Sequence, residues 1–246
     1  MFQNIGELLL LFWLALKALP FAWRQREKIF EQLFEIGMAS LLMACILSLF
    51  IGGVLALQAG SVLVQRGLGN VIGGMVGVSM CKELGPVMMS ILIAGRMGSA
   101  MAAEIGSMRA YQEIDALKTM NINPIHYLVM PRILAITIAL PLLVVFSIMV
   151  GWFGGALVSA YNHMIGISIP SYFNNLRQVV SLGDVANGLI KSFIFAMVIG
   201  VVSCQQGLQT RGGPRGIGRS VTKAVVNSIV LILILDYFLT RLLINL

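Results

Sequence analysis

Long uninterrupted apolar runs restrict this sequence to one class of fold. Residues 36–57 alone contain 22 positions without a charged side chain. A helix of ~20 apolar residues crosses the hydrocarbon core of a bilayer. Because lipid offers no hydrogen bonds, backbone polar groups in the bilayer are satisfied only in helices or closed barrels. The sequence therefore predicts an all-α integral membrane protein with five transmembrane helices, at residues 36–58, 71–104, 133–158, 185–204 and 224–246.

The composition excludes a large soluble α/β domain. Charged residues make up 11% of the chain and hydrophobic residues 58%, whereas a soluble domain of this size has ~25% charged residues. Too few polar side chains remain to cover a surface in water. We expect a single membrane domain over residues 1–246.

The first apolar run, residues 5–19, is too short to cross a bilayer. It ends at Pro20, and the basic residues Arg24, Arg26 and Lys28 follow. We therefore expect residues 1–30 to contain a helix that lies in the cytoplasmic membrane interface. A short or frayed span is the alternative.

The distribution of basic residues predicts the orientation of the chain. With the N-terminus in the cytoplasm, only Arg66, Arg177 and Arg241 fall outside. Cytoplasmic connections of membrane proteins are enriched in Lys and Arg, which favours N-terminus in and C-terminus out. The net charge of +7 then reflects orientation, so nucleic acid is not expected as a partner. Eleven basic residues lie on the cytoplasmic side in this arrangement: Lys17, Arg24, Arg26, Lys28, Arg109, Lys118, Arg132, Arg211, Arg215, Arg219 and Lys223.

Three ionisable residues lie inside predicted spans. At 1.5 Å per residue, Lys191 is about 10 Å deep from the outer face, Asp236 is about 9 Å deep, and Glu83 lies roughly a turn deeper. Because a charge inside the bilayer needs a partner or water, we expect these three to line an outward polar cavity as one network. A purely structural ion pair is the alternative. Leu57 and Gln58, at the end of the first span, are also candidate cavity residues. Lys82 points about 100° away from Glu83 on a helix and is a poor partner for the same cavity.

Gly85 and Pro86 interrupt the second span beside these charges. Proline removes a backbone hydrogen bond and presses on the preceding turn, so the helix is expected to bend here. We predict that these two residues form a hinge.

A row of small residues follows the hinge: Ala94, Gly98, Ala102 and Gly106 recur at every fourth position. On a helix they form a smooth face that lets another helix approach closely. The helix that approaches this face belongs either to the same chain or to a second subunit, and the sequence leaves both alternatives open.

Residues 107–120 form an amphipathic connection on the predicted cytoplasmic side, stopped by Asn123-Pro124. Such a helix could lie on lipid or dock into a groove of a soluble partner. The residues that we expect to meet such a partner are Tyr111, Glu113, Ile114, Asp115, Leu117 and Met120.

No residues of this chain form a nucleotide or metal site by their spacing. The stretch GPRGIGRS, residues 213–220, imitates a phosphate-binding loop, but Arg219 replaces the required Lys and no strand precedes it. His126 and His163 lie in different connections without companion ligands. We therefore expect no catalytic residues and no cofactor bound by this chain.

Residues 82–135, which begin KELGPVMMSILIAGRMGSAMAAE, resemble the signature of the MlaE family of ABC transporter permeases, which maintain lipid asymmetry. The resemblance extends through GLIKSFIFA (188–196) and SIVLILILDYFLT (228–240). One departure is Asn121, where the family usually has Gly, although Asn also tolerates a left-handed backbone.

The resemblance implies a phospholipid permease in the bacterial inner membrane. It implies a homodimer, a separate cytoplasmic ATPase that binds ATP and Mg²⁺, and a periplasmic Mce-type carrier protein. By position, Glu83, Lys191 and Asp236 match the family's polar cavity residues, and residues 107–120 match its coupling helix. Two alternatives from other classes are an ion-coupled secondary transporter that uses the same three residues as a relay, and a non-transporting scaffold for an ATPase.

Overall fold

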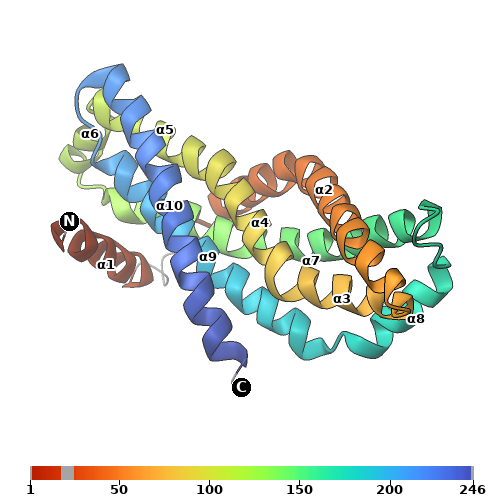
Figure 1. Cartoon of the computed structure of the whole chain (residues 1–246). Helices are drawn as coiled ribbons and strands as arrows, with labels where there is room; N and C mark the ends of the chain where they lie inside the picture. Colours follow the sequence, from red (N-terminus) through yellow and green to blue (C-terminus); the bar gives the residue numbers. More distant parts are fainter. Residues whose placement is uncertain (1, 18–24, 245–246) are drawn as a thin grey trace. The chain divides into compact units, whose positions relative to one another are not determined.

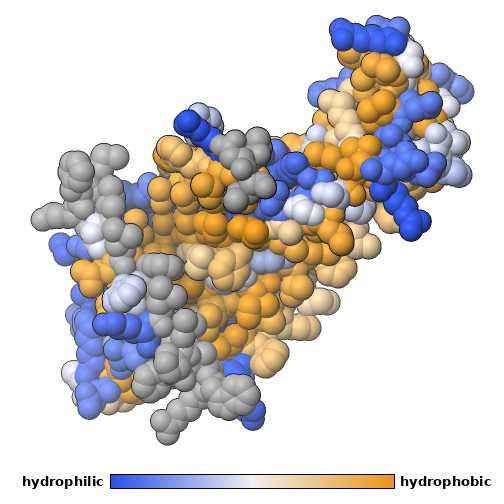
Figure 2. Space-filling view, turned by 90° about the horizontal axis from the view of Figure 1, so that it is seen from below, coloured by the Kyte–Doolittle hydropathy of each residue, from blue (hydrophilic) through white to orange (hydrophobic). Residues whose placement is uncertain are grey.

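The computed structural model describes residues 2–17 and 25–244, and all regular elements in these ranges are helical (Figure 1). Five helical stretches in these ranges are long and apolar enough to cross a membrane: 26–65, 69–110, 125–161, 182–208 and 213–243. This confirms the all-α prediction with five candidate spans. Figure 2 shows apolar residues over much of the face that it draws, as expected of a chain whose solvent is lipid.

The helices run beyond the predicted spans. The elements are α1 (Phe2–Lys17), α2 (Arg26–Gln65), η2 (Gly69–Val71), α3 (Ile72–Ser79), η3 (Met80–Leu84), α4 (Gly85–Ile93), η4 (Ala94–Gly98), α5 (Ser99–Ala110), α6 (Glu113–Thr119), η5 (Ile125–Val129), α7 (Met130–Tyr161), α8 (Ile169–Val179), α9 (Leu182–Leu208) and α10 (Gly213–Ile244).

The N-terminal part differs from the prediction in its boundaries. Helix α1 covers 16 residues of the expected interfacial segment, while residues 18–24, including Pro20, lie outside the described residues. Helix α2 begins at Arg26, ten positions before the predicted span. The polar residues that precede the apolar run form the first turns of the same helix.

A glycine ends α2. Gly67 has φ 72°, a conformation that glycine adopts without a steric penalty. The Gly67 N–H donates to the Val64 carbonyl and the Leu68 N–H donates to the Leu63 carbonyl. This pair of bonds is a Schellman motif, which satisfies carbonyls left open at a helix end.

The contacts divide the chain into two compact units, each described by itself. One comprises residues 40–89 and 141–192, and the other residues 1–39, 90–140 and 193–246. The boundaries fall within α2, α4, α7 and α9. The single membrane domain stays a prediction.

In the first unit, α2 and α7 pack backbone to backbone. A Cβ atom at Gly52 would lie 2.0 Å from the Gly151 carbonyl oxygen, and one at Gly154 would lie 2.1 Å from the Leu49 carbonyl oxygen. The buried hydroxyls of Ser48 and Ser147 form a 2.7 Å hydrogen bond across the same contact. Small residues at these positions permit this close approach in lipid.

Helix α8 packs against α3 in the same unit. The Gly74 N–H donates to Asn175 Oδ1 at 2.6 Å. A Cβ atom at Gly73 would lie 2.2 Å from the Tyr172 carbonyl oxygen. The Tyr172 ring is buried in the core of this unit, and burial raises the pKa of its hydroxyl.

In the second unit, the predicted small-residue row contacts α9 and the residues directly after it. A Cβ atom at Gly98 would lie 2.9 Å from Ser203 Oγ, and one at Gly106 would lie 2.8 Å from Thr210 Oγ1. The other two members of the row, Ala94 and Ala102, are fully buried. The row therefore serves packing within the chain.

Candidate functional site

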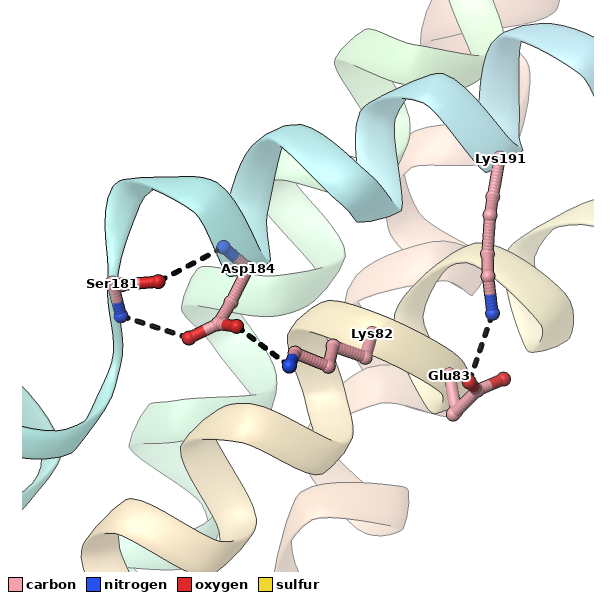
Figure 3. Close-up of polar contacts among 5 residues, drawn as sticks. All are labelled: Lys82, Glu83, Ser181, Asp184 and Lys191. Carbon is pink, nitrogen blue, oxygen red and sulfur yellow. Dashed lines mark hydrogen bonds and ion pairs between the residues drawn. The ribbon is translucent and has the colours of Figure 1, made fainter. Parts of the chain in front are cut away.

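Glu83 and Lys191 form an ion pair between η3 and α9. Lys191 Nζ lies 2.8 Å from Glu83 Oε1, and Figure 3 shows the long lysine side chain reaching across to the carboxylate. The Lys191 side chain is 2% exposed and that of Glu83 is 40% exposed. Two residues predicted to belong to one network are thus in direct contact.

A second ion pair joins the same two elements. Lys82 Nζ lies 2.8 Å from Asp184 Oδ1, with side-chain exposures of 39% and 13%. Both pairs are drawn in Figure 3. The sequence analysis gave Lys82 no partner and did not consider Asp184, which directly precedes the predicted fourth span.

Two sequence signals could have identified Asp184. It lies seven residues before Lys191, which is two helical turns, so both side chains share one face of α9. Asp184 is also the third residue after Ser181, at the beginning of the helix. The Ser181 N–H donates to Asp184 Oδ2 at 2.9 Å, and the Asp184 N–H donates to Ser181 Oγ at 3.2 Å. This reciprocal capping box fixes the carboxylate that Lys82 contacts.

Helix α9 approaches η3 closely at Gly188. This glycine lies between Asp184 and Lys191 at the same helical spacing. A Cβ atom there would lie 2.1 Å from the Cys81 carbonyl oxygen and 3.2 Å from Pro86 Cγ. Asp184, Gly188 and Lys191 therefore form the face of α9 that meets Lys82 and Glu83.

The hinge residues Gly85 and Pro86 follow a π-helical turn. The Gly85 N–H donates to the Met80 carbonyl, five residues back, and Pro86 has no N–H to continue the pattern. A proline inside a helix is accommodated by such a wider turn. The structure thus has an irregular helix at the predicted place, and the bend and the hinge stay predictions.

These two pairs present opposite charges at a site between membrane helices. Two ammonium groups and two carboxylates balance, and Lys82 and Glu83 keep part of their surface exposed. Such groups can bind a ligand that carries both signs of charge, while apolar neighbours accept its hydrocarbon part. Leu57 and Gln58 lie on α2 with exposed side chains. Asp236 lies on α10 in the other unit, and its membership of the network stays a prediction.

The predicted helix at residues 107–120 is divided in the structure. Helix α5 continues to Ala110, and α6 begins at Glu113. Gln112 between them has φ 61°, and Asn121 after α6 has φ 59°, so Asn121 does adopt the left-handed conformation.

Arg109 and Asp115 connect α5 to α6 across this turn. Arg109 Nη1 donates to Asp115 Oδ1 at 2.7 Å, and Lys118 Nζ lies 3.5 Å from the same oxygen. The hydrogen bond from Arg109 lowers the pKa of the Asp115 carboxyl from its ordinary value. Asp115 therefore holds the turn, and its contact with a partner stays a prediction.

Burial divides the residues of the expected partner surface into two groups. Ile114 is 2% exposed and belongs to the core of its own unit, and Leu117 packs against the same cluster. Tyr111 and Met120 are 71% and 62% exposed, and Glu113 is exposed. Amphipathic spacing identified a buried face but could not tell the chain's own core from a partner's groove.

Sequence comparisons show which known proteins this chain is similar to. Residues 29–242 match the family model described as Permease MlaE. The chain is 37% identical to a probable ABC transporter permease protein of Rickettsia typhi, over 98% of this chain and 92% of the relative. It is 39% identical to a probable ABC transporter permease protein of Synechocystis, over 87% and 81% of the two chains. The Arabidopsis thaliana protein TRIGALACTOSYLDIACYLGLYCEROL 1, chloroplastic, is 38% identical over 85% of this chain and 59% of its own length.

Proposed function

The chain belongs to the MlaE family of ABC transporter permeases, and we propose from this premise that it moves phospholipid between a membrane and a carrier protein. A permease of this class is a multi-pass transport subunit without catalysis of its own, and it works with an ATPase partner. The proposal concerns its substrate, its further partners and its orientation.

The two ion pairs between η3 and α9 carry the proposal. A phospholipid has a polar head group and aliphatic tails. The two ion pairs offer charges of both signs to the head group, and the helices around them are otherwise apolar. The Arabidopsis relative is named for trigalactosyldiacylglycerol, a lipid with two acyl chains. This name supports a lipid with two acyl chains as the substrate class, and its trigalactosyl head group is not carried over to this chain.

The remaining parts of the proposal follow from membrane topology. With the N-terminus in the cytoplasm, the ion pairs lie in the outer half of the bilayer and α6 lies on the cytoplasmic side. A homodimer supplies two permease walls around the lipid, and an Mce-type carrier receives the lipid outside. The bacterial inner membrane, with a role in outer-membrane lipid asymmetry, is the proposed location.

Reconstitution tests this function. The purified permease with its ATPase is placed in vesicles that contain labelled phospholipid, and transfer of label to the soluble part of the carrier is measured with and without ATP. We expect transfer that requires ATP and is lost when the ATPase is inactivated. Transfer that follows an ion gradient without ATP would identify a secondary transporter, and ATP hydrolysis without transfer in a folded complex would identify a scaffold.

A further inference from the structure

A polar pocket of about 150 Å³ lies between the first turns of α2 and the η5–α7 helix. Its residues all belong to one compact unit, and none of them belongs to the ion pairs between η3 and α9. From α2 come Lys28, Glu31 and Gln32; from the other helix come Tyr127, Leu128, Pro131 and Arg132. We propose that this pocket binds the phosphoethanolamine head of a membrane lipid.

The basic side of the pocket suits a phosphate. Lys28 Nζ lies 3.1 Å from the centre of the Tyr127 ring. Arg132 donates from Nη1 to the Leu128 carbonyl at 3.1 Å and from Nη2 to Glu104 at 2.9 Å. Its buried Nε has no hydrogen-bond partner within the described part of the chain. The guanidinium group of Arg132 nevertheless lines the pocket, and guanidinium groups bind the anionic oxygens of phosphates.

The backbone adds to this preference for an anion. Helix α2 begins at Arg26, and the second helix begins at Ile125, so the pocket lies near the N-terminal ends of two helices. Helix N-termini carry partial positive charge, which favours an anion nearby. At ~30 Å³ per water, the volume corresponds to about five waters, which is sufficient for one head group.

The carboxylate of Glu31 decides between head groups. Glu31 is an exposed acidic side chain that lines the same pocket. It would repel a second negative charge but can accept hydrogen bonds from a primary ammonium. Phosphoethanolamine carries one phosphate and one ammonium, and so it complements Lys28, Arg132 and Glu31 together.

The position of the pocket favours a lipid as the source of this head group. It lies at the ends of two candidate spans, where the polar head groups of a bilayer are found. Tyr127 is 38% exposed, and Phe30 and Phe34 in the same stretch of α2 are 66% and 69% exposed. Such aromatic side chains are typical of the membrane interface.

Native mass spectrometry of the full complex tests the proposal. The complex is titrated with phosphatidylethanolamine or phosphatidylglycerol of identical acyl chains, and the bound lipid per permease is counted. We expect phosphatidylethanolamine to be retained preferentially. Lys28→Gln should weaken retention of both lipids by roughly fivefold, since a basic residue near the bilayer surface contributes about that factor, and Lys28→Arg should restore it. Glu31→Gln should remove the preference between the two lipids.

The same helix offers matched controls. Arg26→Gln and Glu27→Gln remove charges of the same sign two residues before Lys28 and four residues before Glu31, at exposed positions that do not line the pocket. Both variants should bind lipid as the unmodified protein does. Equal effects of the pocket variants and these controls would overturn the proposal. Displacement of bound lipid by millimolar soluble phosphoethanolamine or inorganic phosphate would also overturn it, by identifying a soluble phosphate compound as the ligand.

Discussion

Lys191 Nζ lies 2.8 Å from Glu83 Oε1, yet only 2% of the lysine side chain is exposed against 40% of the glutamate side chain. The buried partner is therefore the cation. A buried charge loses its hydration, and this loss is offset only by an opposite charge and hydrogen bonds in good geometry. Removal of Glu83 should therefore cost more than removal of Lys191, because it leaves a buried ammonium, whereas removal of Lys191 leaves a carboxylate that is 40% exposed.

This asymmetry predicts the effect of removing Glu83. Glu83→Ala leaves the ammonium of Lys191 buried without this carboxylate, and we expect a loss of ~3–5 kcal/mol in unfolding free energy. Adding Lys191→Met removes the buried charge and should recover most of this loss, although lipid transfer should stay low. Thermal unfolding of the purified protein measures the first effect and reconstituted transfer the second. Glu27→Ala, an exposed carboxylate on α2, is the control. Equal stability of Glu83→Ala and Glu27→Ala would contradict the prediction.

Stability measurements also test whether Asp236 belongs to the network of Glu83 and Lys191. If it shares Lys191 with Glu83, the effects of Lys191→Met and Asp236→Asn on stability should not add, and the double variant should be less damaged than their sum. Independent sites add within ~0.3–0.5 kcal/mol. A coupling energy inside that margin would remove Asp236 from the network.

Gly188 should be intolerant of any side chain. A Cβ atom there would lie 2.1 Å from the Cys81 carbonyl oxygen, so Gly188→Ala must move α9 away from η3. We expect a destabilisation of ~1–3 kcal/mol, typical of overpacking, and reduced lipid transfer because both ion pairs are stretched. Gly183→Ala on the same helix is the matched control, since its nearest neighbour is Ser181 Oγ at 3.5 Å. A Gly188→Ala protein with unchanged melting temperature would show that the close approach is not needed.

Exposed residues of the α5–α6 connection should carry the interaction with the ATPase. Tyr111→Asp and Met120→Asp alter side chains that are 71% and 62% exposed, so they should weaken ATPase copurification while the permease stays folded. Ile114→Asp places a charge in the core of its own unit and should instead lower the yield of folded permease. If both exposed variants retain the ATPase and its lipid-stimulated activity, the partner contacts another surface.

Acid should loosen the same connection through Asp115. Its pKa in the folded protein is lowered by the hydrogen bond from Arg109, so its contribution to stability is complete above the unfolded pKa of about 3.9. The contribution is lost as pH falls through the lower folded value. Hydrogen-exchange protection of the α6 amides, corrected for the intrinsic rate, should therefore be constant from neutral pH to about pH 5 and fall below pH 4. Asp115→Asn should lack this acid-dependent step, and an identical pH profile in that variant would assign the step to another group.

Local sequence patterns determined the features that depend only on the surrounding lipid and on a single helix: the spans, the charges within them and the irregular turn at Pro86. Apolar runs such as residues 36–57 predict spans because lipid permits few alternatives for the backbone. Charges inside such runs, at Glu83 and Lys191, were identifiable because each is costly without a partner. Pro86 indicated an irregular helix because proline cannot complete the hydrogen-bond pattern.

Tertiary structure decided which of these features meet. The sequence did not show that Lys82 pairs with Asp184, because a pairing between helices depends on which faces approach, and Gly188 sets that approach at Cys81. It did not show that Ile114 faces the chain's own core, because an amphipathic spacing specifies a buried face and not the surface that buries it. The sequence by itself thus determined that Glu83 and Lys191 need partners, and the packing of α9 against η3 decided how these two residues, Lys82 and Asp184 pair.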